Sequence, residues 1–112
     1  MEILNFHHSY EKEIINKTKN TTVRLGDKTG KYKGNQKVMI TVVKHDFRQD
    51  KIGEAIIEEC FTRQIKDLTE EDLAGESEDV NTKEKLKLAL NKLHGLPIGN
   101  NTEVTVIKFH FI

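Results

Sequence analysis

The alternation of hydrophobic and polar residues predicts two short strands near the start of the chain. An apolar run over residues 2–6 predicts the first, and residues 21–25 predict the second. In the second, the two-residue repeat of a strand places Thr22 and Arg24 on one face, with Val23 and Leu25 pointing the other way into a core.

Three longer strands are predicted further along the chain. Residues 36–44 are β-branched and apolar on both sides, which is typical of a central strand. Residues 51–62 predict a strand with an irregularity near residues 55–57. A helix is the main alternative there, because Glu54, Glu58 and Glu59 disfavour a strand. Residues 103–112 predict the last strand.

Three segments predict helices. Ser9 is a candidate N-cap for a helix running to about Lys17. Thr69 and Asp72 form a capping-box pattern at the start of a helix over residues 68–74. A third helix is expected from Asn81 to a stop at Gly95.

The order of these elements predicts an α+β fold, either a small β-barrel or a strongly bent mixed sheet with flanking helices. The three middle strands are expected to be antiparallel neighbours, because few residues separate them. The 112 residues suit one domain spanning residues 1–112.

Composition suggests a protein of the cytoplasm. No apolar run approaches the length of a membrane span, and the first residues carry no signal-peptide pattern. The lone Cys60 excludes an internal disulfide and fits a reducing compartment.

Charge is unevenly distributed although the formal net charge is zero. Residues 17–37 hold seven basic residues and one acid, a net charge of +6, whereas residues 54–79 hold two basic residues and ten acids, a net charge of −8. A basic patch is expected of a protein that meets phosphates. The alternative is that the two segments face and neutralise each other.

The candidate chemistry centres on residues 17–26. Lys19, Thr22 and Arg24 follow the order K-x-x-T-x-R, and their side chains can converge on one surface to hold a phosphate or a polarised carbonyl. The alternative is the ordinary solvent-facing side of a half-buried strand. Lys28 and Lys33, in the basic segment that follows, are further candidate ligand contacts.

Glu76 is a candidate acidic partner for this site. It follows the Thr69 helix within a run of acids, and crowding by those acids would raise its pKa and suit proton transfer. The alternative is a solvated acid after a helix. The scattered histidines give no zinc spacing, so neither a metal nor a cofactor is expected.

At these residues the sequence resembles an ASCH domain, a family related to the PUA fold. The resemblance rests on Lys19-x-x-Thr22-x-Arg24 after a helix, the Lys33-Gly34-Asn35 turn, residues 68–73 followed by Glu76, and the closing strand at residues 104–109. It covers essentially the whole chain. The departures are Asn16-Lys17-Thr18, where the family often has a glycine before the motif lysine, and Gly34-Asn35 in place of glycine-aspartate.

The resemblance implies a barrel-like sheet with a cleft for RNA or a nucleotide-like ligand. Small bacterial members of the family include N4-acetylcytidine amidohydrolases, and by resemblance their lysine, threonine and glutamate correspond to Lys19, Thr22 and Glu76. The leading hypothesis is binding of RNA or a modified nucleoside. The alternatives are amide hydrolysis, with Thr22 as nucleophile, Lys19 as base and Glu76 as acid, and a protein-interaction module that uses the acidic surface of residues 54–79.

Overall fold

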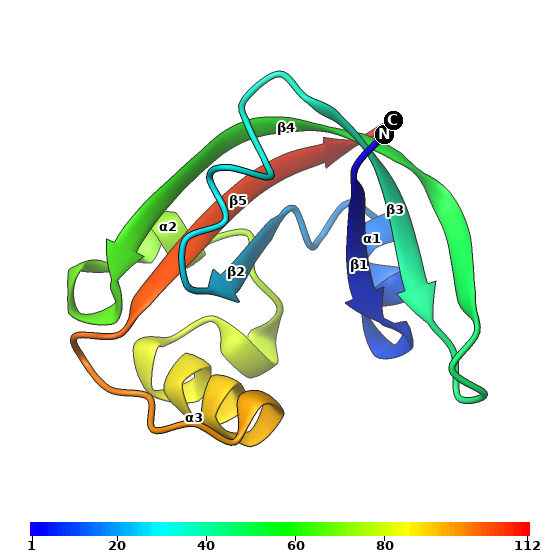
Figure 1. Ribbon diagram of the computed structural model, residues 1–112. Coiled ribbons are helices and arrows are strands. Elements are labelled where there is room, and N and C mark those ends of the chain that lie inside the picture. Colours follow the sequence, from blue (N-terminus) through cyan, green and yellow to red (C-terminus); the bar gives the residue numbers. More distant parts are fainter.

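Residues 1–112, described by a computed structural model, form a five-stranded sheet that curls into a half-barrel (Figure 1). The strands lie in the order β1-β3-β4-β5-β2, with β1 parallel to β3 and the other neighbours antiparallel. Their bounds are β1 (Ile3–His7), β2 (Thr21–Leu25), β3 (Lys37–Val43), β4 (Gln49–Gln64) and β5 (Glu103–Phe111). The predicted strongly bent mixed sheet of an α+β fold is therefore confirmed.

The prediction that the three middle strands are neighbours is right for β3 and β4 but wrong for β2. β2 pairs with β5 at the far edge of the sheet, and residues 26–36 carry the chain back across to β3. Tyr32 makes this crossing favourable, because its ring is buried in the core and its hydroxyl donates to the carbonyl of Ile3 at 2.7 Å. β3 is an interior strand, as its two-sided apolar pattern predicts.

β4 is a strand and not a helix, despite its glutamates. Glu58 and Glu59 are exposed, and Glu54 forms ion pairs with Lys37 at 3.2 Å and Lys51 at 3.5 Å. The register of β4 against β5 shifts between Ile57 and Glu59, just after the predicted position of the irregularity. A bulge of this kind increases local twist and bending. β4 and β5 together form the arch of the half-barrel (Figure 1).

The helices are short except for the last. A 3-10 turn, η1 (His8–Tyr10), precedes α1 (Glu11–Ile15), and the prediction of Ser9 as an N-cap is wrong. The imidazole of His7 takes that role by accepting from the backbone N–H of Ser9, and Tyr10 precedes α1 without a side-chain cap. The helix also ends two residues before the predicted Lys17.

The capping box of Thr69 and Asp72 is confirmed at α2 (Glu70–Leu73). The last helix, α3 (Lys83–His94), is capped by Thr82 and not by the predicted Asn81. Both side chains can cap, but the Thr82 hydroxyl is the one placed to accept from the backbone N–H of Lys85. Gly95 ends α3 in the left-handed conformation, as predicted. Two further 3-10 turns are η2 (Ile65–Asp67) and η3 (Glu78–Val80).

Two hydrophobic clusters form the core and lie on opposite faces of β5. One gathers β1, β3 and β4 around Ile40 and Phe109, and the other gathers α3 and the loop regions around Leu86 and Val104. β5 contributes side chains to both, so the two clusters share one continuous sheet. None of the helices is long and apolar enough to cross a membrane.

Candidate functional site

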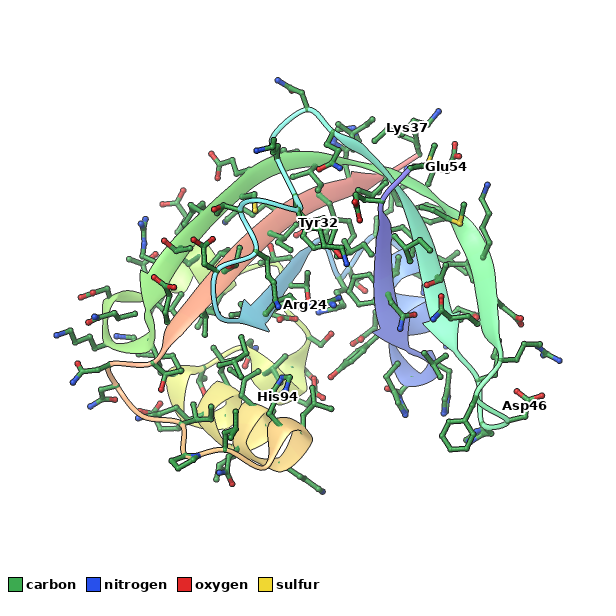
Figure 2. The ribbon with its side chains drawn as sticks, viewed as in Figure 1. Arg24, Tyr32, Lys37, Asp46, Glu54 and His94 are labelled. Carbon is green, nitrogen blue, oxygen red and sulfur yellow. The ribbon has the colours of Figure 1, made fainter.

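β2 presents Thr22 and Arg24 on the same face, as the alternation predicts. The Arg24 Nε donates to Thr22 Oγ1 at 3.1 Å, and its Nη2 donates to the backbone carbonyl of Asn5 on β1 at 2.7 Å. Val23 points the other way and is buried in the second hydrophobic cluster, against which Leu25 also packs. Arg24 therefore lies between the two edge strands of the half-barrel (Figure 2).

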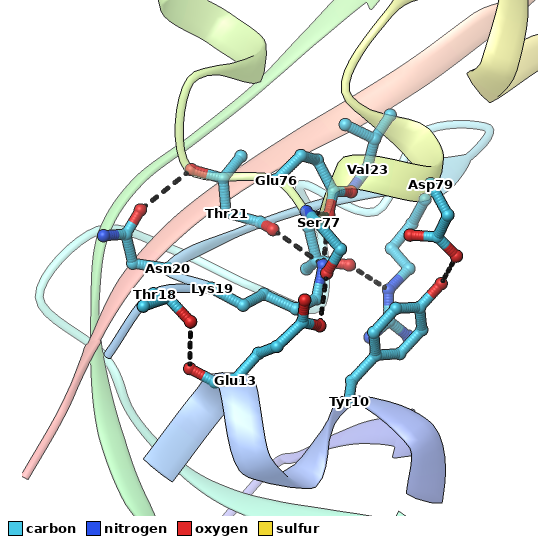
Figure 3. A network of polar contacts seen from close by, with 12 residues as sticks. Tyr10, Glu13, Thr18, Lys19, Asn20, Thr21, Val23, Glu76, Ser77 and Asp79 are labelled. Atoms are coloured by element: carbon cyan, nitrogen blue, oxygen red, sulfur yellow. Dashed lines mark hydrogen bonds and ion pairs between the residues drawn. The ribbon is translucent and has the colours of Figure 1, made fainter. Parts of the chain in front are cut away.

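Lys19 and Glu76 form a buried ion pair at the start of β2 (Figure 3). The ammonium of Lys19 also donates to the carbonyl of Thr21 at 3.0 Å. The carboxylate of Glu76 accepts from the backbone N–H of Ser77 at 2.9 Å and of Val23 at 3.2 Å. Every oxygen of this carboxylate is thus engaged, and the loop after α2 is attached to β2 through it.

Gly75 sets the position of this loop. Its carbonyl accepts from the backbone N–H groups of Asn20 at 3.0 Å and Thr21 at 3.1 Å. A Cβ at residue 75 would lie 1.8 Å from Asn20 Oδ1 and 2.6 Å from Thr21 Oγ1, so the close approach requires glycine. This contact brings Glu76 next to Lys19.

Burial is the main influence on Glu76. It raises the pKa of Glu76, while Lys19 and the backbone N–H groups of Ser77 and Val23 act in the opposite direction. The predicted cause, crowding by neighbouring acids, is wrong, because burial has the largest effect and no neighbouring carboxylate contributes. Asp79 accepts from the Tyr10 hydroxyl at 2.7 Å. Burial and this hydrogen bond raise the pKa of Tyr10, so its hydroxyl remains protonated.

The four predicted residues Lys19, Thr22, Arg24 and Glu76 all line one cleft with a volume of about 450 Å³. One wall is apolar and comes from α3 and η3. The opposite wall comes from the ends of β1 and β3. The further lining residues are Asn5, Phe6, His7, Tyr10, Val23, Val43, Val80, Leu86, Ala89, Leu90 and Leu93.

Aromatic rings enclose the cation of Lys19. Its Nζ lies 4.9 Å from the ring centroid of Tyr10 and 5.7 Å from that of Phe6, and the guanidinium of Arg24 lies 5.0 Å from the Phe6 centroid. Such cation–π contacts add to the stabilisation of desolvated cations. The floor of the cleft therefore combines cations, one carboxylate and a hydroxyl, beside the apolar wall from α3 and η3.

Lys28 and Lys33 are both exposed and do not line this cleft. Their backbone N–H groups bond to Thr105 Oγ1 and Gln36 Oε1, at 2.8 Å each. Their predicted ligand contacts stay predictions.

The basic and acidic segments are joined by two ion pairs, Lys19–Glu76 and Lys37–Glu54. The proposed mutual neutralisation is thus local and limited to these pairs. No group of three or more His, Cys, Asp or Glu side chains is placed to hold a metal ion. Cys60 is partly buried, and this burial raises the pKa of its thiol.

Sequence reasoning missed several lining residues. Asn5 contributes a backbone carbonyl, which leaves no mark in a residue pattern, and Tyr10 reaches the site from the turn before α1. The apolar residues of α3 are spaced along one helix face, which is typical of a core-facing stripe, and Leu86 and Leu90 are buried. Leu93, however, is 75% exposed and lines the cleft. Its spacing gives no sequence signal that separates Leu93 from the buried Leu86 and Leu90.

No protein-family model matches the sequence, and no curated protein matches it. Solved structures do match. The ASCH domain from Lactobacillus crispatus JV V101 superposes with a TM-score of 0.69 at 11% identity, over 98% of this chain and 79% of that one. The chain has the fold of an ASCH domain.

Two further structures share this ASCH fold. A protein from Enterococcus faecalis V583, assigned to the DUF984 family, has a TM-score of 0.69 at 11% identity, over 100% of this chain and 81% of that one. The hypothetical protein PH0355 has a TM-score of 0.70 at 13% identity and full coverage of both chains. At these identities the similarity establishes the ASCH fold alone.

Proposed function

We propose that the cleft binds a nucleobase, presented by RNA or as a modified nucleoside. The observation that carries this proposal is the convergence of Lys19, Thr22, Arg24 and Glu76 on the floor of one apolar-walled cleft. Ligand sites of this type combine apolar walls with a few convergent polar groups. A flat aromatic base fits between such walls and carries hydrogen-bonding groups along its edge.

Arg24 is the main recognition group in this proposal. Lys19 is neutralised by Glu76, whereas Arg24 has no carboxylate partner among the ion pairs of the protein. A guanidinium has more N–H donors than the two bonds to Thr22 and Asn5 use. The remaining donors suit the carbonyl oxygen of a base, and Thr22 supplies a hydroxyl beside them.

The test is the substitution Thr22→Val, which removes the hydroxyl and keeps the β-branched shape. Calorimetric titration with cytidine and with a short oligocytidylate should show an affinity about tenfold lower than wild type. Thr62→Val is the matched control on β4, since Thr62 does not line the cleft. Equal affinity of Thr22→Val and wild type would refute this role of the cleft.

The second candidate function is amide hydrolysis at an acylated cytidine. The favouring observation is the raised pKa of Glu76, which suits a general acid, beside Thr22 in the same cleft. In this assignment the proton of the Lys19–Glu76 pair first moves to Glu76, so that the neutral amine of Lys19 accepts the hydroxyl proton while Thr22 attacks the acyl carbon and Glu76 protonates the leaving amine. Water then hydrolyses the acyl-threonine ester and releases the acyl group as a carboxylic acid. The Thr22 hydroxyl bonds to Arg24 and not to Lys19 in this structure, so Lys19 must first exchange its partners.

Incubation with N4-acetylcytidine separates the two functions. If the protein hydrolyses this compound, cytidine is released by wild type and not by Thr22→Ala. Binding of cytidine without turnover of N4-acetylcytidine would leave the binding function and exclude the hydrolytic one.

A further inference from the structure

A row of aromatic rings leads away from the mouth of the cleft. His7, which lines the cleft, packs against His8 with ring centroids 4.2 Å apart and ring planes tilted by 33°, and His8 packs against His45 at 3.9 Å with a tilt of 53°. Phe47 lies two residues beyond His45 in the turn between β3 and β4. His7, His8, His45 and Phe47 are here called the aromatic strip.

The pairing of β1 with β3 places the strip beside the cleft. His7 and Val43 are partners in the parallel register at the ends of these strands, and both line the cleft. The turn that carries His45 and Phe47 continues directly from β3, as the ribbon shows (Figure 1). The strip therefore starts at the cleft wall and runs outward to the tip of the hairpin.

Phe47 is unfavourably placed for stability alone. Its side chain is 89% exposed, so the ring gains little from burial, and its φ of 63° is a left-handed conformation that bulky residues rarely adopt. The turn is nevertheless well defined, since the Phe47 N–H donates to the Lys44 carbonyl at 3.0 Å and the Lys44 N–H donates to the Arg48 carbonyl at 2.8 Å. A solvent-facing ring on a backbone held in a disfavoured conformation points to a partner that contacts the ring.

The charges around the strip are paired. Lys44 bonds to Glu11 at 2.8 Å, and Arg48 bonds to Asp50 at 2.9 Å and lies 3.6 Å from Asp46. Neither cation is left without a carboxylate partner. The strip therefore offers ring faces more than positive charge, and the partner that fits it binds by stacking.

We propose that the aromatic strip stacks the unpaired nucleotides of a single-stranded RNA that flank a base held in the cleft. Unstacked bases bind to aromatic and histidine rings because every base has a π-face. This proposal rests on the proposed function of the cleft. It adds that the ligand is a strand and not an isolated nucleoside, and it assigns the strip as the surface that binds the strand.

The test compares a fluorescein-labelled oligocytidylate, measured by anisotropy, with free cytidine, measured by calorimetry. His45→Ala and Phe47→Ala should each weaken oligonucleotide binding about tenfold and leave cytidine binding unchanged. His45→Phe, which retains a ring, should restore binding. Because the nearby cations are paired, the affinity should depend only weakly on salt.

The controls use exposed residues away from the strip. His110→Ala on β5 matches His45→Ala, and Leu88→Ala on α3, where the side chain is 72% exposed, matches Phe47→Ala. Both controls should bind the oligonucleotide as wild type does. Circular dichroism should show that all variants are folded, since the substituted side chains are exposed.

The outcomes separate the strip from the cleft. If cytidine binds and the oligonucleotide binds no more tightly, or if both alanine variants bind the oligonucleotide as wild type does, the strip proposal is overturned and the cleft function stands. If neither probe binds to wild type, both proposals are overturned.

Discussion

At the scale of single residues, the Lys19–Glu76 pair dominates the electrostatics of the site. Both side chains are 3% exposed, so each has lost nearly all contact with water. Moving charges out of water is costly, and the pair persists because backbone N–H groups and a carbonyl complete its hydrogen bonds. The loss of either partner would leave a buried charge without compensation.

Glu76→Gln should therefore lower the free energy of unfolding by about 3 kcal/mol, because the ammonium of Lys19 keeps its burial and loses its counter-charge. Urea unfolding followed by circular dichroism measures the change. Glu78→Gln, at an exposed position two residues along, is the control and should be close to neutral. The double variant Lys19→Met, Glu76→Leu should recover much of the loss, and failure to do so would show that packing and not charge determines the cost.

His8 predicts a pH dependence. Partial burial and then the neighbouring rings of His45 and His7 lower the pKa of His8, Lys44 acts in the same direction, and Glu11 opposes them. A histidine with a lowered pKa binds fewer protons folded than unfolded. Its contribution to stability is therefore present above the unfolded value of about 6.5 and is lost as the pH falls through the folded pKa.

NMR titration of the His8 ring should accordingly give a midpoint below about 6.5. His8→Gln should make the unfolding free energy less sensitive to pH across the same range. A midpoint at or above the ordinary histidine value would contradict the lowered pKa.

At the scale of elements, the bend of β4 depends on a close contact with β5. The ring of Phe111 packs over Gly53, and a Cβ at residue 53 would lie 2.4 Å from its Cζ and 2.7 Å from its Cε2. The nearby register shift between Ile40 and Thr41 in the pairing of β3 with β4 occurs at the partner of Gly53. Phe111 thus covers the point where β4 departs from regular pairing.

Gly53→Ala should displace the Phe111 ring and lower the unfolding free energy by about 2 kcal/mol, the usual cost of overpacking. Thermal unfolding by calorimetry measures the loss. Gly99→Ala is the matched control, because nothing lies within 4 Å of a Cβ there. Equal stability of the two variants would show that the Phe111 ring moves aside without cost.

At the scale of the whole molecule, sequence patterns predicted the elements better than their arrangement. The alternation in residues 21–25 and the capping box at Thr69 depend on neighbours in the chain, and both are confirmed. The choice of Thr82 over Asn81 as a cap depends on a local geometry that both residue types could satisfy. The parallel pairing of β1 with β3 leaves no local signal at all.

The candidate site likewise combines contacts that local sequence predicts with contacts that depend on the folded arrangement. Thr22 and Arg24 share a strand, so their common face could be read from spacing. Glu76 lies 57 residues from Lys19, and residues near Glu76 do not encode that contact. It depends on Gly75 docking against Asn20 and Thr21, a backbone contact that only the folded chain reveals.

Arg24 connects the two edges of the sheet. β1 and β2 are its opposite edges, and the Arg24 Nη2 bond to the Asn5 carbonyl spans the open seam between them. The same guanidinium faces the cleft, so binding of a ligand to its N–H donors is thermodynamically linked to closure of the seam. By reciprocity, if ligand binding favours the closed seam, a change that tightens the seam raises the ligand affinity and a change that opens it lowers the affinity. If ligand binding favours the open seam, both effects are reversed.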